Sequence, residues 1–259
     1  MKAKDLLNLP RCCPWLSGLD ETESQRVQRD LQVRSFGAGS LVCRRGEPRA
    51  YWVGVFSGLL LVVRDDERSL PGLPAIAPGG WLGDDSLVDG ERCAEDVVAL
   101  RNSHLALLPA DTYLWLRERS LGFNQMLLSR LEQRMRQCLQ QAQLGRPAGA
   151  DERVAQTLLG LFDPVLHPAV GQTLRITQEE LAEICSLSRQ RVNQALQRLA
   201  ALGLLRLRYG GIELAQLQAL RQFIGRAEPA TRVVPRGADG AAPADGASPP
   251  AAADSPHWA

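Results

Sequence analysis

The strongest constraint on the fold comes from residues 177–205, which read TQEELAEICSLSRQRVNQALQRLAALGLL. Thr177 is followed three residues later by Glu180, which is the spacing of a capping box at the start of a helix. At the end of the turn CSLS, Ser188 has the character of a second N-cap. Apolar residues then recur at helical spacing, at Val192, Leu196 and Leu199. The segment predicts two short helices joined by a tight turn that lacks the glycine often found there.

The polar side chains change in kind between these two helices. The first helix is acidic, whereas residues 188–205 contain arginine and amide side chains and no carboxylate. Arginine can donate a bidentate pair to guanine, and asparagine or glutamine can pair with adenine. The alternative is an ordinary solvated helix face. Together with the capping and the spacing, the pattern favours a helix-turn-helix whose second helix enters the major groove of DNA. The side chains expected to point outward are Arg189, Gln190, Arg191, Asn193, Gln194 and Gln197.

The next residues, GLLRLRYGGIEL, predict a two-stranded wing. Arg206 and Arg208 alternate with leucines, and Gly210 and Gly211 supply the turn. The two arginines are placed to contact the phosphate backbone.

Residues 31–110 alternate short apolar runs with glycines, which is typical of short strands separated by turns. The close spacing predicts a small β-roll or barrel. The expected strands are residues 41–44, 52–56, 59–63, 97–100 and 105–108.

From residue 111 to about residue 143 the apolar period changes to alternating steps of three and four, a heptad pattern. We expect one helix that pairs with a copy of itself; the alternative is a helix that packs on its own β-roll. Asn124 would fix the register of the pair. The charged residues Arg130, Glu132, Arg134 and Arg136 are expected to flank the seam in solvent. The seam residues are Leu121, Asn124, Leu128, Leu131, Met135, Cys138 and Ala142.

The chain as a whole excludes several classes of protein. It has 259 residues and a net charge of +1, so any nucleic-acid surface must be a local patch. Neither a secretory signal nor a membrane-length apolar run is found, so we expect a cytoplasmic protein with no membrane partner. The six cysteines are scattered without a CxxC, which favours reduced thiols and no metal site. No nucleophile–base pair or phosphate loop occurs at usable spacing, and we expect no enzyme.

The segment ITQEELAEICSLSRQRVNQALQRLAALGLLRLRYGGIEL resembles the winged helix-turn-helix of Crp/Fnr-type transcription regulators. FGAGSLVCRRGE, GVFSGLL and APGGWLGDDSLVDGERCAEDVVAL resemble the β-roll of cyclic-nucleotide-binding domains, and the likeness covers roughly residues 15–225. It implies a homodimer on a palindromic DNA operator, with RNA polymerase as a further partner. Arg189, Gln190 and Gln194 would read base edges. Asn193 is left open. The implied phosphate contacts are Thr177, Gln178, Ser188 and Arg191.

The expected fold class is α+β, with an N-terminal double-stranded, jelly-roll-like β-roll, a long dimerisation helix and a C-terminal winged helix-turn-helix. Residues 1–30 are expected to be helical and peripheral. Pro147 and Gly149 indicate a hinge, and the Ala/Pro/Gly-rich end of the chain is expected to be disordered. The expected parts are an N-terminal extension (1–15), the cyclic-nucleotide-binding-like β-roll (16–110), the dimerisation helix (111–145), the hinge (146–150), the DNA-binding domain (151–225) and the tail (226–259).

The resemblance also implies an effector pocket, at Gly83, Asp84, Arg92 and Cys93. Cyclic-nucleotide binders hold the ribose with a glutamate and the phosphate with an arginine and a serine. Here aspartate and cysteine replace glutamate and serine, and cysteine is a weak donor. Residues 130–150 contain no serine or threonine to hold adenine. Further acids surround the phosphate position, at Asp85, Asp89, Glu91, Glu95 and Asp96.

These departures argue against cAMP or another cyclic nucleotide as the effector, which stays unknown. An iron–sulfur cluster is disfavoured because Cys12 and Cys13 lack the usual N-terminal cysteine series. Haem is disfavoured because the three histidines lie on an expected strand (His104), in a loop (His167) and in the tail (His257). Two rival interpretations remain: a cyclic-nucleotide-binding module with a non-transcriptional output, and a regulator with a degenerate pocket that needs no effector.

Overall fold

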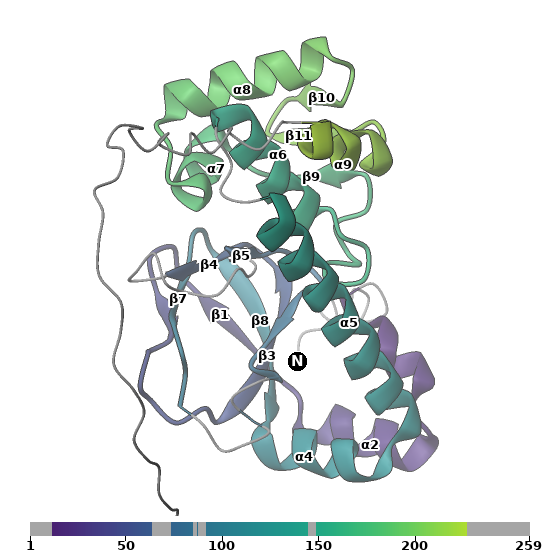
Figure 1. Cartoon of the computed structure of the whole chain (residues 1–259). Coiled ribbons are helices and arrows are strands. Elements are labelled where there is room, and N and C mark those ends of the chain that lie inside the picture. Colours follow the sequence, from purple (N-terminus) through teal and green to yellow (C-terminus); the bar gives the residue numbers. More distant parts are fainter. Residues whose placement is uncertain (1–11, 64–73, 85–86, 88–91, 145–148, 227–259) are drawn as a thin grey trace, which may run out of the picture. The chain divides into compact units, whose positions relative to one another are not determined.

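The computed structural model describes residues 12–63, 74–84, 87, 92–144 and 149–226 (Figure 1). The expected tail and most of the expected hinge lie outside these residues.

Residues 12–30 are part of the protein core, so for this part of the N-terminal segment the expectation that it is peripheral is wrong. A 3-10 helix, η1 (Pro14–Gly18), precedes α2 (Glu21–Asp30), which Asp20 and Glu23 close with a reciprocal capping box. Trp15 of η1 is 7% exposed and packs edge-on against Trp81 and Phe123 at centroid distances of 5.6 and 5.4 Å. The expectation failed because the residues that anchor the segment, Cys12, Cys13, Trp15 and Val27, are buried without forming a periodic pattern.

The β-roll consists of two four-stranded antiparallel sheets, ordered β1-β8-β3-β6 and β2-β7-β4-β5 (Figure 1). All five expected strands are present within two residues of their expected ends. Three were not expected, because β1 is polar and β5 and β6 have two residues each. Trp81 lies flat against Gly54, where an added Cβ would come within 2.6 Å of the indole. The strands are β1 (Gln32–Phe36), β2 (Leu41–Cys43), β3 (Tyr51–Ser57), β4 (Leu60–Val63), β5 (Ala75–Ile76), β6 (Trp81–Leu82), β7 (Asp96–Ala99) and β8 (Ser103–Pro109).

The expected single helix after the roll is two helices, α4 (Ala110–Arg119) and α5 (Leu121–Leu144). The break lies at Ser120, whose hydroxyl accepts a hydrogen bond from the Phe123 amide at 3.2 Å. The Asn124 side chain donates to the carbonyls of Arg117 (2.7 Å) and Ser120 (2.8 Å). Asn124 therefore stabilises the corner between α4 and α5 with both of its donors.

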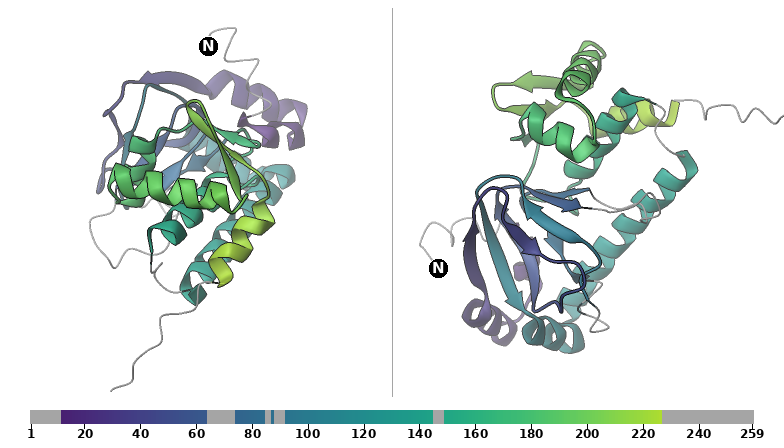
Figure 2. Two further views of the ribbon diagram at one scale, coloured as in Figure 1. Left: turned by 90° about the horizontal axis from the view of Figure 1, so that it is seen from above. Right: turned by 90° about the vertical axis from the view of Figure 1, so that its left-hand side faces the viewer.

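The C-terminal part combines four helices with a three-stranded sheet ordered β10-β11-β9 (Figures 1 and 2). Its core includes the fully buried Val154, Leu158, Leu181 and Leu199. This arrangement confirms the expected helix pair and wing; β9 was too short to be expected. The elements are α6 (Ala150–Leu161), β9 (Thr173–Leu174), α7 (Gln178–Cys185), α8 (Arg189–Ala201), β10 (Leu205–Arg208), β11 (Gly211–Leu214) and α9 (Leu217–Arg226).

Candidate functional site

The helix pair α7–α8 is fixed by local hydrogen bonds that the sequence encodes. Thr177 accepts from the Glu180 amide at 3.1 Å, and the Glu180 carboxylate accepts from the Thr177 amide at 2.8 Å, which confirms the capping box. Ser188 caps α8 by accepting from the Arg191 amide at 3.3 Å. Between the helices, Ser186 adopts the left-handed conformation (φ 51°) that glycine commonly supplies after a helix. The turn therefore forms without the missing glycine.

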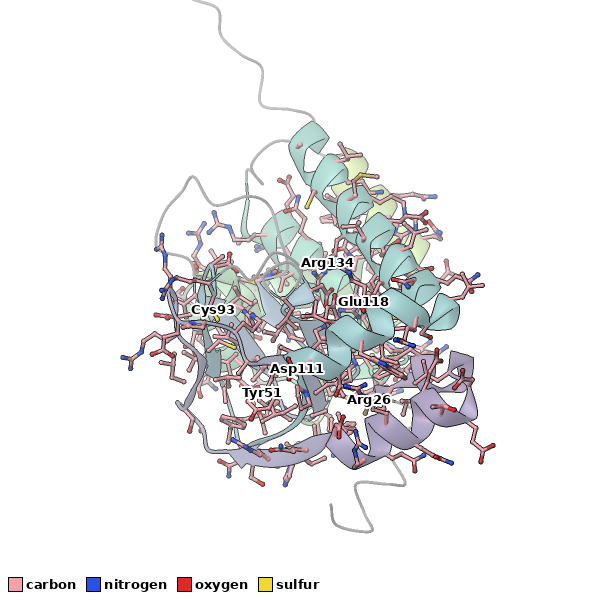
Figure 3. The ribbon with its side chains drawn as sticks, turned by 90° about the horizontal axis from the view of Figure 1, so that it is seen from below. Arg26, Tyr51, Cys93, Asp111, Glu118 and Arg134 are labelled. Carbon is pink, nitrogen blue, oxygen red and sulfur yellow. The ribbon has the colours of Figure 1, made fainter. Side chains whose placement is uncertain are left out.

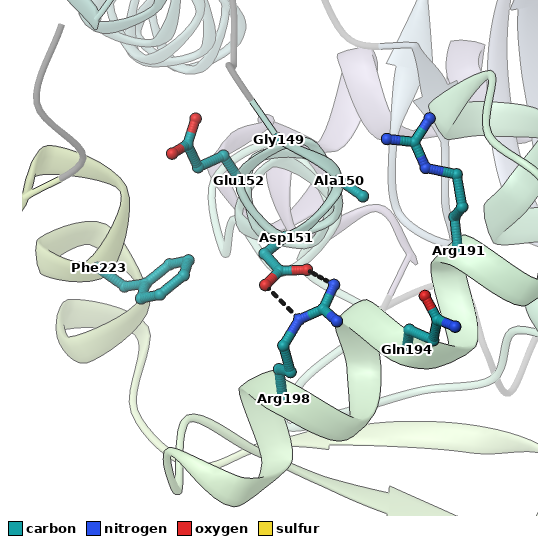
Figure 4. Close-up of a pocket in the computed structure, with 8 residues that line it drawn as sticks. All are labelled: Gly149, Ala150, Asp151, Glu152, Arg191, Gln194, Arg198 and Phe223. Carbon is teal, nitrogen blue, oxygen red and sulfur yellow. Dashed lines mark hydrogen bonds and ion pairs between the residues drawn. The ribbon is translucent and has the colours of Figure 1, made fainter. Parts of the chain in front are cut away.

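One face of α8 is buried and the other is open. Val192, Ala195, Leu196 and Leu199 are at most 2% exposed and hold the helix against the domain core. Figure 4 shows Arg191, Gln194 and Arg198 projecting from α8. The exposed face has no acid and carries Arg189, Gln190, Arg191, Gln194, Gln197 and Arg198.

Asn193 lies between these two faces. Its side-chain oxygen accepts a hydrogen bond from Gln178 at 3.1 Å, and both side chains are half-buried. Of the two orientations left open by the sequence, Asn193 faces α7. The pair ties the second helix to the N-terminus of the first, so Asn193 positions α8 through its oxygen.

Several arginines of this surface hold carboxylates in the DNA-free chain. Arg189 pairs with Glu179 at 3.0 Å. Arg206 (3.4 Å) and Arg208 (2.6 Å) share Glu213, and hydrogen bonding to Arg208 lowers the pKa of that carboxyl. Solvent-exposed pairs of this kind are weak because water and salt screen them, so a DNA phosphate or a base edge can displace the carboxylates.

Arg198 has a different role from these arginines. It makes a bidentate pair with Asp151 of α6 at 2.6 and 2.5 Å (Figure 4). Because the fork engages both carboxylate oxygens, Arg198 anchors the C-terminal half of α8 to α6.

The wing lies beside the start of α7. A depression of about 220 Å³ separates them and is lined by Thr177, Gln178, Arg208 and Gly210, among others. At the tip, Tyr209 is fully exposed. The depression is thus lined by expected phosphate-contacting residues that come from two distant segments of the chain.

On the sensor side, Asp84 is held by the protein itself. The Trp52 indole N–H donates to one carboxylate oxygen, and Arg134 and Arg130 of α5 lie 3.2 and 3.8 Å from the other. Both arginines also donate to the Trp81 carbonyl, at 3.0 and 2.8 Å. Arg134 is labelled in Figure 3, where it projects from α5 toward the roll.

This ion cluster corrects one expectation. Arg130 is not a solvated flank of the seam: it is 5% exposed, and burial lowers its pKa to about 10 despite the opposing effect of Asp84. The half-buried Arg134 likewise faces the roll. The heptad pattern identified the seam face of α5, but it carried no information on which of its charges meets Asp84.

The four expected effector-pocket residues, Gly83, Asp84, Arg92 and Cys93, are called the cassette below, and two of them, Gly83 and Cys93, lie near a residue that sequence reasoning missed, Arg49. Its side chain packs against Gly83 so closely that an added Cβ would come within 2.6 Å of it. It also donates to the Cys43 sulfur at 3.3 Å, and Cys43 in turn contacts Cys93, the buried residue at the serine position. Burial is the main cause of the raised pKa of Cys43.

Some of the other charged residues in and around the cassette lie within the described residues. Arg92 donates to the Gly46 carbonyl at 2.7 Å, and Asp96 accepts from the Arg45 amide at 2.6 Å. Asp85, Asp89 and Glu91 lie outside the described residues, so the expected ring of negative charge is tested only in part.

The expected seam forms an apolar stripe along α5. Leu121, Leu128, Leu131 and Met135 are 74, 57, 63 and 56% exposed. Ala142 is also exposed and Cys138 is half-exposed, whereas Asn124 is committed to its own chain. Leucine side chains this exposed on a helix indicate a face that becomes buried when the protein assembles with a partner.

Within the described residues, no group of three or more metal-ligating side chains comes together, and no helix is long and apolar enough to span a bilayer. His104 lies on β8 and its ring contacts Ser57 at 3.1 Å. His167 is 1% exposed, and its Nδ1 lies 3.0 Å from the Gly160 carbonyl oxygen.

Both halves of the chain match domains of known proteins. Residues 33–120 match a cyclic nucleotide-binding domain, and residues 152–223 match a Crp-like helix-turn-helix domain. The cyclic AMP receptor protein of Thermus thermophilus is 29% identical over 215 residues, which are 81% of this chain and 96% of the relative. Transcriptional regulator SdrP of the same organism is 29% identical over 204 residues, 74% of this chain and 95% of that protein.

Among solved structures, FixK2 from Bradyrhizobium japonicum has the same fold, with a TM-score of 0.56 at 19% identity over 74% of this chain and 96% of that one. The two domain matches, in the order and with the geometry described above, lead to one conclusion. The chain belongs to the Crp/Fnr family of transcription regulators, with a cyclic-nucleotide-binding-type sensor domain and a Crp-like helix-turn-helix DNA-binding domain.

Proposed function

We propose that the protein regulates transcription as a homodimer whose two α8 helices bind successive major grooves of a palindromic operator. The observation that carries this proposal is the exposed face of α8, which presents Arg189, Gln190 and Gln194 and carries no acid of its own, while the opposite face is buried. Two such helices must lie roughly 34 Å apart to enter both half-sites. The proposal includes a cytoplasmic location, which DNA binding supports, and RNA polymerase as a further partner.

The phosphate contacts follow from the same geometry. Thr177 and Gln178 line the depression beside the wing, and Arg208 lies across it. Ser188 and Arg191 stand at the exposed start of α8, and Arg206 lies on the wing. These side chains set the register on the duplex, whereas the three base-reading residues set the sequence.

Selection of binding sites from random duplex DNA tests this proposal. We expect enriched sequences with two inverted half-sites about one helical turn apart. A single unrepeated half-site would contradict the homodimer, and enrichment of no sequence would contradict sequence-specific regulation.

The sensor pocket favours an effector other than cAMP. The acid expected to take the ribose hydroxyl, Asp84, is already bound by Trp52 and by two arginines of α5. A nucleotide would have to break this cluster, and Cys93 would then replace a serine as its phosphate donor. The same contacts of Asp84 join the roll to α5 within the chain itself, which supports a regulator that needs no effector.

Calorimetric titration with cAMP and with cyclic di-GMP separates these alternatives. We expect no binding in the micromolar range for either nucleotide. Micromolar heats from one of them would show that the Asp84 cluster opens, and would make the protein a nucleotide-gated switch. Sequence-specific DNA binding in the absence of any nucleotide would argue against a non-transcriptional module.

A further inference from the structure

A small cavity lies where the N-terminal segment, β6 and α5 meet. Its volume is about 240 Å³, and its walls include Trp15, Trp81 and Met126, with Arg130 as the cationic member and the exposed Ser129 at its edge. None of the cassette residues lines it, so it is separate from the position at which the family resemblance places an effector.

Two side chains of this cavity carry donors without a partner. The indole N–H of Trp15 and the Nε–H of Arg130 are buried and find no hydrogen-bond acceptor among the described residues. Both side chains are more than nine-tenths buried, with 7% and 5% of the residue exposed. A buried donor without an acceptor destabilises the fold, so native proteins rarely leave two of them at one place. An acceptor oxygen brought in by a ligand would satisfy them.

The local charge favours an acidic ligand. Among the described residues, Arg130 and Arg134 share a single carboxylate, that of Asp84. The Asp163 carboxylate is engaged elsewhere, by the side-chain amides of Gln133 and Gln137 and by backbone amides of its own loop. Two guanidinium groups therefore face one carboxylate, and a second carboxylate would balance the pair and form the stronger, charge-assisted hydrogen bonds.

We propose that this cavity binds a small organic acid, with its carboxylate on Arg130 and an apolar, single-ring body against the walls formed by Trp15, Trp81 and Met126. The size is consistent, because the volume is below the roughly 300–1,000 Å³ of sites for drug-sized ligands. The ligand would compete for the arginine that joins α5 to Asp84. A regulatory effect of this competition rests on the proposed function, whereas binding itself does not.

Calorimetry of the full chain with phenylacetate and benzoate tests the proposal, and the neutral phenylacetamide and benzamide are matched controls of the same shape. We expect the acids to bind at least about tenfold more tightly than the amides, since one charge-assisted pair differs between them. Equal affinity of acid and amide would overturn the assignment of Arg130 as the carboxylate partner. Absence of binding by both acids at millimolar concentration would overturn the site.

Two variants locate the bound acid. Ser129→Phe adds a ring at the exposed edge of the cavity without removing Arg130 or Trp15, and we expect at least a tenfold loss of affinity with unchanged thermal unfolding. Arg92→Ala changes the cassette and leaves the cavity intact, so its affinity should equal that of the parent chain. The reverse result would move the ligand to the cassette and overturn the proposal. Operator binding, measured separately, decides the proposed function independently of this outcome.

Discussion

At the residue scale, Arg189 is the side chain whose role can be tested most directly. It lies at the first position of α8, exposed and paired only with the exposed Glu179. If it donates to a guanine, Arg189→Ala should weaken operator binding by about 1–3 kcal/mol and leave binding to random DNA nearly unchanged. Fluorescence anisotropy with both duplexes measures the two affinities.

Arg198→Ala is the matched control, because it removes the same charge from the same helix at a residue that anchors α8 to Asp151. It should not relax the base preference at any operator position. If Arg189→Ala weakens operator and random DNA equally, Arg189 is a phosphate contact and the base-reading assignment is wrong.

Residue-level expectations held where a local pattern determines the contact, and failed where a distant partner does. The caps of Thr177 and Ser188 follow from spacing alone and are present. Asn124 was expected in the seam and Arg130 on its solvated flank, because both lie on the heptad helix. Their partners, Asp84 and the Ser120 corner, lie on other elements or at a break that the apolar period does not reveal.

At the element scale, the apolar stripe of α5 carries the prediction of a dimer. Leu131 is 63% exposed in the middle of this stripe. In a paired helix the substitution Leu131→Asp would place two carboxylates in an apolar seam, which is strongly unfavourable. We expect sedimentation velocity to report monomers for this variant and dimers for the parent chain.

Gln140→Asp is the control on the same helix, since Gln140 is exposed and lies outside the seam positions. It should remain dimeric. A Leu131→Asp dimer of undiminished stability would place the interface on another surface of the molecule.

A helix or strand could be predicted from the sequence where its apolar residues repeat regularly over the whole element. The side chains of the five apolar strands follow a two-residue pattern, and those of the helix pair follow a three-to-four-residue pattern. All of these elements are present. The strands β5, β6 and β9 have two residues each, too few for any period, and exist because a longer strand beside them supplies hydrogen bonds. The N-terminal segment joined the core through Trp15, an anchor that only the packed structure reveals.

At the scale of the whole molecule, the buried His167 predicts how stability depends on pH. Its ring is 1% exposed, and burial lowers its pKa from an ordinary 6.5 to about 4, with the nearby Arg130 and Arg134 acting in the same direction and Asp163 opposing them. The unfolded chain therefore binds a proton at His167 more readily than the folded chain. Stability is complete above pH 6.5 and declines as the pH falls toward 4.

The magnitude follows from the shift of about 2.5 pKa units, since each unit corresponds to 1.36 kcal/mol. We expect a loss of about 2 kcal/mol between pH 7 and pH 5 in urea unfolding, and His167→Gln, which cannot titrate, should flatten this slope. The carboxyl groups with lowered pKa, those of Asp30 and Glu213, act below this window, because their ordinary pKa lies near 4. An equal slope in both proteins would show that His167 is not held neutral by the fold, and that the packing around it opens before the chain unfolds.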